Sequence, residues 1–256
     1  MKYAAQSNLN DRQRQMLERI SREGEVRIAD LREAFGVTEM TIRRDLEKLE
    51  ETGSIKRTFG GAIFVGQDVA LKERSGLHTE EKARIGRKAA SLIRPGESVF
   101  LDGGTTTLQI ARHLPVGMQV TIVTNALNVA AELTARQIPT IMTGGTLLET
   151  THSLVGPLAV QGLSAMAFDR AFLGATGVSV EHGFSNSNLY EAEIKQLAIR
   201  QSAETAIVAD RTKFGAKVLV SFAPLAGVRR IVTDERPDEA MLQACADSGV
   251  TVEVAD

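Results

Sequence analysis

Seven short apolar runs alternate with helical stretches in the second part of the chain, and this rhythm limits the fold more than any other feature. The runs are Ser98–Leu101, Val120–Thr124, Thr140–Thr143, Arg170–Gly174, Thr205–Ala209, Arg230–Thr233 and Val250–Val254. Continuous apolar strands separated by helices are typical of a mostly parallel sheet with helices on both faces. The sequence therefore predicts an α/β domain over residues 79–256.

Polar and glycine residues gather where these strands are expected to end. Ligands of open α/β sheets bind outside the carboxyl ends of the strands. The clearest turn is Leu101-Asp102-Gly103-Gly104-Thr105-Thr106-Thr107, followed by an expected helix over Leu108–His113. Such a turn offers backbone N–H groups, a favourable helix dipole and threonine hydroxyls to an anion. It has neither the lysine of a P-loop nor the GxGxxG spacing, which disfavours a nucleotide.

Three further strand ends have the same character: Thr124-Asn125, Thr143-Gly144-Gly145-Thr146 and Gly174-Ala175-Thr176-Gly177. Each alone could be an ordinary tight turn, but four in one domain favour a shared small-ligand site. Glu191 and Lys195 lie four residues apart on an expected helix, where a surface ion pair is the alternative interpretation. Lys, Asn and Thr groups around an anion hole suit a polyol that carries a phosphate.

The residues predicted to bind this ligand come from all of these turns and from the stretch after the strand that ends at Ala209. They are Asp102, Gly104, Thr105, Thr106, Thr107, Thr124, Asn125, Gly144, Gly145, Gly174, Glu191, Lys195, Asp210 and Lys213.

A second constraint is the stretch from Gly36 to Leu49, which predicts a short helix with a well-defined start. Thr38 is a good N-cap, and Val37 and Ile42 stand at the two positions of a hydrophobic staple. Ile42, Leu46 and Leu49 repeat at helical spacing and give one buried stripe. The opposite face carries Met40, Arg44 and Lys48. This pattern suits a helix in a DNA major groove, although an amphipathic surface helix would share it.

The neighbouring segments favour DNA binding. Asn10 with Gln13 predicts a capped helix up to Gly24, and Asp30 with Glu33 predicts a capped second helix over Leu31–Phe35. Gly36 joins the second and third helices, as in a helix-turn-helix. Two strand-like runs then flank Gly60-Gly61 and predict a hairpin, or wing. We expect a winged helix-turn-helix domain over residues 1–65 and a linker over 66–78.

The predicted DNA contacts divide into two roles. Met40, Thr41 and Arg44 would read base edges, whereas the remaining cations would hold phosphates. The full set is Thr38, Met40, Thr41, Arg43, Arg44, Lys48, Lys56 and Arg57.

Composition narrows the class of protein. The formal net charge is -2, so any nucleic-acid site must be local. The single cysteine, Cys245, excludes an intramolecular disulfide framework and fits a reducing compartment. Neither a membrane-spanning apolar run nor a secretory signal is visible, so we expect a cytoplasmic protein without a membrane partner. The four histidines lack metal-ligand spacing, and we expect no metal, cofactor or catalytic residue.

The motif Val37-Thr38-Glu39-Met40-Thr41-Ile42-Arg43-Arg44-Asp45-Leu46, with Ile55-Lys56-Arg57-Thr58-Phe59-Gly60-Gly61-Ala62, resembles the DeoR family of bacterial transcriptional repressors. The second part resembles the sensor domain of that family in the pieces Phe100-Leu101-Asp102, Val123-Thr124-Asn125, Asp169–Gly174 and Asp210–Gly215. The resemblance implies a fold similar to ribose-5-phosphate isomerase and a phosphorylated sugar, or related metabolite, that relieves repression. Phe59 and Gly103 depart from the histidine and the serine common in the family.

We therefore expect a repressor of a carbohydrate-metabolism operon that binds double-stranded operator DNA and a phosphorylated sugar. Two half-sites require at least a dimer, so a homo-oligomer, dimer or tetramer, is expected. The alternative is a phosphosugar isomerase-like enzyme with an appended DNA-binding domain. Its general base would come from Asp102, Glu191 or Asp210.

Overall fold

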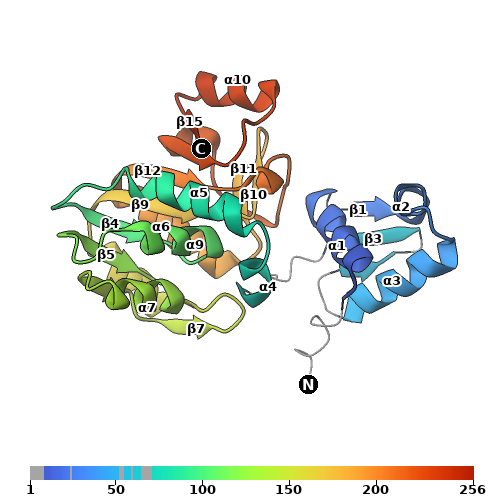
Figure 1. Cartoon of the computed structure of the whole chain (residues 1–256), viewed down its shortest axis with the longest axis horizontal. Helices are drawn as coiled ribbons and strands as arrows, with labels where there is room; N and C mark the ends of the chain where they lie inside the picture. Colours follow the sequence, from blue (N-terminus) through green and yellow to red (C-terminus); the bar gives the residue numbers. More distant parts are fainter. Residues whose placement is uncertain (1–8, 24, 52–54, 59, 65–70) are drawn as a thin grey trace.

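The computed structural model describes residues 9–23, 25–51, 55–58, 60–64 and 71–256, and it consists of two parts (Figure 1). The N-terminal part is a small helical bundle with a three-stranded sheet. Its elements are α1 (Asp11–Glu23), β1 (Glu25–Arg27), α2 (Ile28–Phe35), α3 (Glu39–Glu51), β2 (Ile55–Arg57) and β3 (Gly61–Phe64).

The helix starts in this part follow the predicted caps in two cases and depart from them in one. The Asn10 and Gln13 side chains each accept a hydrogen bond from the other's backbone N–H, at 2.9 and 3.1 Å, which confirms the capping pair. The predicted cap at Asp30 is wrong, because α2 begins two residues earlier, at Ile28. Arg27 is still paired with Gly61 in the sheet, so the strand passes directly into the helix.

The wing sheet has the order β1-β3-β2 and is antiparallel throughout. The wing therefore gains a third strand from the short run before α2. Gly61 is required where β3 meets β1, because a Cβ there would lie 1.9 Å from the carbonyl oxygen of Val26. Phe59, the departure in the expected hairpin, lies outside the described residues.

The core of the N-terminal part holds the predicted stripe of α3. Ile42, Leu46 and Leu49 are fully buried against α1, α2 and the sheet. Asp45 is buried beside them and accepts hydrogen bonds from Arg12 Nε and Gln13 Nε2, both at 2.8 Å. These two bonds fix the direction of α3 against α1.

The C-terminal part is built on a seven-stranded parallel sheet in the order β15-β14-β12-β9-β4-β5-β6. Each strand overlaps one of the seven apolar runs, which confirms the predicted α/β class, although β9 and β12 begin two and three residues earlier than predicted. The strands are β4 (Ser98–Leu101), β5 (Thr121–Thr124), β6 (Thr140–Met142), β9 (Phe168–Gly174), β12 (Ser202–Val208), β14 (Arg230–Thr233) and β15 (Thr251–Val254).

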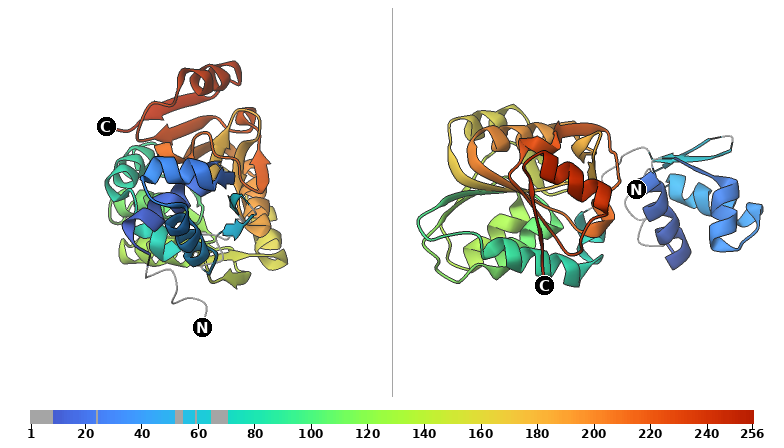
Figure 2. Two further views of the ribbon diagram at one scale, coloured as in Figure 1. Left: turned by 90° about the vertical axis from the view of Figure 1, so that its right-hand side faces the viewer. Right: turned by 90° about the horizontal axis from the view of Figure 1, so that it is seen from above.

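Helices cover both faces of this sheet (Figure 2). Along β4, Val99 and Leu101 pack into one hydrophobic cluster, whereas Phe100 between them packs into the other. The first face is covered by α5 (Thr79–Ala90), α6 (Thr105–His113) and α7 (Leu127–Ala135). The cluster on the second face includes residues of α8 (Pro157–Ser164), α9 (Leu189–Arg200) and α10 (Glu239–Asp247).

Several short elements were not predicted. They are α4 (Leu71–Ser75), the hairpin β7 (Thr146–Leu148) with β8 (Ser153–Val155), the 3-10 turns η2 (Arg211–Lys213) and η3 (Leu225–Gly227), and an antiparallel sheet of β10 (Gly177–Ser179), β11 (Gly183–Asn186) and β13 (Val220–Ala223). Helix α4 falls within the expected linker, and its Leu71 N–H donates to Thr150 O at 2.9 Å. The predicted division at residues 65/66 lies in a segment outside the described residues and stays a prediction. None of the helices described is both long and apolar enough to cross a bilayer.

Candidate DNA-reading helix and effector site

The outward face of α3 carries the predicted base-reading side chains. Thr38 caps the helix, because its Oγ1 accepts from the N–H of Thr41 at 3.4 Å and lies 3.0 Å from the Thr41 hydroxyl. Met40 is 73% exposed, and Arg44 and Lys48 are also exposed. Among the residues that the structure describes, no carboxylate pairs with Arg44 or Lys48. Both cations are therefore available to an external anion.

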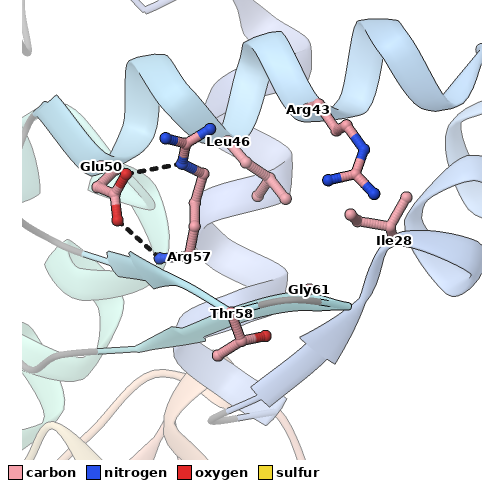
Figure 3. Close-up of a pocket in the computed structure, with 7 residues that line it drawn as sticks. All are labelled: Ile28, Arg43, Leu46, Glu50, Arg57, Thr58 and Gly61. Atoms are coloured by element: carbon pink, nitrogen blue, oxygen red, sulfur yellow. Dashed lines mark hydrogen bonds and ion pairs between the residues drawn. The ribbon is translucent and has the colours of Figure 1, made fainter.

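Two predicted phosphate contacts have internal partners instead. Arg43 Nη2 lies 2.8 Å from Glu39 Oε1, one turn back on α3, and both side chains are half exposed. Arg57 is held by Glu50, which accepts from its Nε at 2.6 Å and from its backbone N–H at 2.9 Å (Figure 3). The side chain of Lys56 lies outside the described residues.

Glu50 therefore ties the wing to the end of α3. A hollow of about 270 Å³ lies between the two elements (Figure 3). It is lined by Ile28, Arg43, Leu46, Glu50, Arg57, Thr58 and Gly61. The sequence did not reveal the Glu50–Arg57 contact, because seven residues and a turn separate the partners, and this spacing matches no helical or hairpin rule.

The second site lies at the carboxyl edge of the seven-stranded sheet, where Asp102, Gly174 and Lys195 come together. The Lys195 ammonium contacts Asp102 Oδ2 and donates to Gly174 O at 3.0 Å, and the Gly174 N–H donates to Asp102 Oδ2 at 3.0 Å. Both charged side chains are 4% exposed. Burial raises the pKa of the Asp102 carboxyl, and the Lys195 ammonium opposes that rise.

Glu191 forms the adjoining part of this site. Its Oε1 accepts from Ser153 Oγ at 2.6 Å and its Oε2 from Asn186 Nδ2 at 2.9 Å. Burial acts to raise the pKa of Glu191, but Lys195 and these hydrogen bonds outweigh burial and lower it. The surface ion pair between Glu191 and Lys195 is thus wrong, since both side chains are buried and the ammonium of Lys195 contacts Asp102.

The Gly-rich turn after β4 supplies a helix N-terminus. Helix α6 begins at Thr105, three residues before the expected start, with Gly104 immediately before it. Thr107 is fully buried and donates to Gly104 O at 3.2 Å, so its hydroxyl serves the turn itself. Thr105 and Thr106 are 8% and 9% exposed and lie in the first turn, whose N–H groups lack helical acceptors. This end of α6 is the part of the site best suited to an anion.

The strand ends after β5 and β6 shape the neighbouring wall. The Thr124 hydroxyl accepts from the Ala126 N–H at 3.1 Å and therefore holds the turn. Asn125 is 1% exposed and donates to Leu154 O at 3.3 Å, while its Oδ1 has no hydrogen-bond partner among the described residues. Gly144 and Gly145 have φ of 71° and 118°, and a Cβ at Gly145 would lie 2.7 Å from Val155 O. These glycines shape the turn.

Asp210 and Lys213 follow β12, two strands away from β4 in the sheet. Neighbouring strands are about 4.8 Å apart, which places Asp210 roughly 10 Å from Asp102. Asp210 Oδ1 accepts from the Thr212 N–H at 3.1 Å, whereas its buried Oδ2 lacks a hydrogen bond in the described part and lies 3.9 Å from Lys213 Nζ. Burial acts to raise the pKa of Asp210, but Lys213, Thr212 and the more distant Lys82 lower it.

Comparisons with known proteins decide the family. Residues 12–68 match the family model of the DeoR-like helix-turn-helix domain, and residues 77–235 match that of the DeoR C-terminal sensor domain. The chain belongs to the DeoR family. Neither model describes an enzyme domain, so the isomerase alternative is not supported, and the protein is a DNA-binding transcriptional regulator with a sensor domain.

Relatives span nearly the whole chain. The uncharacterized regulator YulB of Bacillus subtilis (strain 168) is 36% identical over 94% of this chain and 95% of its own. A putative aga operon transcriptional repressor of Escherichia coli O157:H7 is 33% identical over 95% of this chain and 93% of its own. Ribose 5-phosphate isomerase A of Methanocaldococcus jannaschii matches 53% of this chain and 54% of its own, with a TM-score of 0.40 and 15% identity. That likeness is too distant to bear on function.

Proposed function

We propose that this regulator represses an operon for carbohydrate metabolism and that a phosphorylated sugar at the carboxyl edge of the seven-stranded sheet controls it. One observation carries the proposal: this edge combines a helix N-terminus suited to a phosphate with buried oxygens suited to hydroxyl groups. Asn125 Oδ1 and Asp210 Oδ2 are buried without a hydrogen bond in the described part. Buried polar atoms normally have a partner, so these two favour a ligand.

The charges favour an anionic polyol over other small molecules. The Lys195 ammonium already compensates Asp102, while Lys213 is about one-third exposed and can approach a second part of the ligand. The phosphate would bind at the first turn of α6, beside the hydroxyls of Thr105 and Thr106. Hydroxyl groups of the sugar would donate to Asp210, two strands farther along the same sheet edge.

The DNA-binding half of the proposal concerns α3 and the wing. Met40, Thr41 and Arg44 would read base edges, and Lys48 would hold a phosphate. Arg43 and Arg57 would exchange Glu39 and Glu50 for phosphates when DNA arrives, together with Lys56. Since one α3 reads one half-site, we propose a homo-oligomer, a dimer or tetramer, that acts on DNA in the cytoplasm.

A thermal-shift panel of pentose and hexose phosphates tests the effector, with each parent sugar as its control. A ligand that binds only the folded state raises the melting temperature by mass action, so only phosphorylated members should raise it. Thr106→Val and Lys213→Ala should abolish the shift, whereas Lys217→Ala, at the exposed pair with Glu181, should keep it. The absence of any shift, or equal shifts from the parent sugars, would contradict the proposal. Each sugar phosphate that raises the melting temperature is then added to a titration of the regulator with a DNA fragment that the full chain selects from a random pool.

A further inference from the structure

The turn between α4 and α5 is fastened by one buried side chain, that of Lys82. Lys82 is 5% exposed, and its Nζ donates to the carbonyl oxygens of Arg74 and Leu77, both at 2.7 Å. An ammonium has three N–H donors, and two of them hold the end of α4 and the turn that follows it. These residues belong to the segment that leads from the DNA-binding domain into the sensor domain (Figure 1).

Lys82 also lies within electrostatic range of the effector-site residues Asp210 and Lys213. The charged groups that act on it are the carboxylates of Asp210 and Glu81 and the cations of Lys213 and Arg74. Burial lowers the pKa of Lys82 to about 8, and the attraction of Asp210 opposes this effect. A buried ammonium is sensitive to any change of charge nearby, because little solvent screens it.

The same turn reaches the DNA-binding domain through His78. This residue precedes α5 in a left-handed conformation, with φ of 51°, and its carbonyl accepts from the Lys82 N–H at 3.0 Å. His78 Nε2 lies 3.8 Å from Glu18 Oε1 on α1. His78 Nδ1 lies 3.6 Å from Glu81, which in turn is 3.3 Å from Arg211, the residue after Asp210. The turn thus touches the reading domain on one side and the effector site on the other.

We propose that Lys82 is the positioning residue through which the effector site controls the DNA-binding domain. The inference rests on the proposed effector at Asp210 and Lys213. Without ligand, the cations around Asp210 are Lys213 and, farther away, Lys82. A ligand that donates to Asp210 Oδ2 and places a phosphate near these cations changes the electrostatic force on the Lys82 ammonium. The ammonium then shifts relative to the two carbonyl oxygens it holds, which moves the turn and alters the His78–Glu18 contact.

Coupling of this kind is measured as the ratio of the Kd for DNA with the effector present to the Kd without it. The DNA is a fragment that the full chain selects from a random pool. The effector is the pentose or hexose phosphate with the largest thermal shift. In the wild type, the Kd for DNA should differ severalfold with and without that sugar phosphate. In Lys82→Met the ratio should fall to about one, while the sugar phosphate still raises the melting temperature. Linkage is reciprocal, so DNA should no longer change the affinity of the variant for the sugar phosphate.

Lys88→Met is the matched control, because Lys88 lies on the same helix but its side chain is 42% exposed and pairs with Glu253 on β15. It should keep the wild-type ratio. A wild-type ratio in Lys82→Met would overturn this inference alone, whereas a ratio of one in the wild type would overturn the proposed control by effector as well. If Lys82→Met does not fold, His78→Asn replaces it, since asparagine tolerates the left-handed conformation but has a shorter, uncharged side chain that cannot form an ion pair with Glu18. An unchanged ratio there would also overturn the inference.

Discussion

The proposed DNA-reading face of α3 and the proposed effector site at the sheet edge differ in how their charged side chains are exposed and paired. On α3 the cations are exposed, and where they have partners, as Arg43 has Glu39, both members are half in solvent. At the sheet edge, Asp102 and Lys195 are almost fully buried and contact each other. A solvent-exposed pair can be exchanged for a phosphate at small cost, whereas a buried charge must always have a partner. The first surface suits a ligand that arrives as a polyanion, and the second suits a ligand that fits around charges already balanced.

The largest expected effect comes from breaking the buried pair. Lys195→Ala leaves Asp102 as an uncompensated buried carboxylate, which should lower the free energy of unfolding by about 3–5 kcal/mol. Urea unfolding of the full chain measures this change. Lys217→Ala is the control, because its pair with Glu181 is exposed and should contribute less than about 1 kcal/mol. Similar losses of stability in the two variants would show that the buried pair depends on its partner no more than the exposed pair does.

Removal of a reading side chain from α3 should change specificity and leave stability intact. Arg44→Ala should cost about 1–3 kcal/mol of discrimination between selected and scrambled DNA, because a bidentate arginine–guanine contact is lost. Fluorescence anisotropy with the two duplexes measures it. Lys48→Ala removes the same charge one turn away. It should weaken both duplexes equally and reduce the salt slope by about one. Unchanged discrimination in Arg44→Ala would show that another residue reads the bases.

The smallest effect is expected where an exposed pair on α3 is broken. Glu39→Gln frees Arg43 and removes one acidic group from the first turn of the helix. The free energy of unfolding should fall by less than about 1 kcal/mol. The affinity for DNA should rise at constant salt, because Arg43 no longer has to leave Glu39 before it meets a phosphate and one acidic group beside the DNA is removed. An unchanged affinity would show that Arg43 does not contact the DNA backbone.

The elements that were predicted correctly depend on local patterns. A run such as Ser98–Leu101 is apolar because helices cover it on both faces, and that burial can be read from the run itself. The caps at Asn10 and Thr38 need only groups three residues away. The start of α2 was missed because Arg27 pairs with Gly61, and a partner so distant in sequence overrides the capping signal at Asp30.

The candidate site was predicted as a set of residues but not as a network. The carboxyl ends of parallel strands lie at one edge of the sheet, and from this we expected Asp102 and Gly174 to lie close together, as they do. The sheet topology does not determine which cation meets which carboxylate. The contact between Lys195 and Asp102 joins residues 93 positions apart, and the hydroxyl of Ser153 reaches Glu191 from a hairpin that was not predicted. Strands of three or four residues, such as Gly183–Asn186, are too short and polar to be recognised from periodicity.

The hydrogen bond from the Arg57 backbone N–H to Glu50 has a consequence for the spacing of contacts along DNA. This bond does not involve the guanidinium, so it can hold the wing at a set distance from α3 even when the guanidinium turns from Glu50 to a phosphate. With α3 seated in a groove, that distance fixes how many base pairs separate the bases it reads from the phosphates under the wing. The spacing of contacts within each half-site would then be set by the folded protein before any DNA is bound.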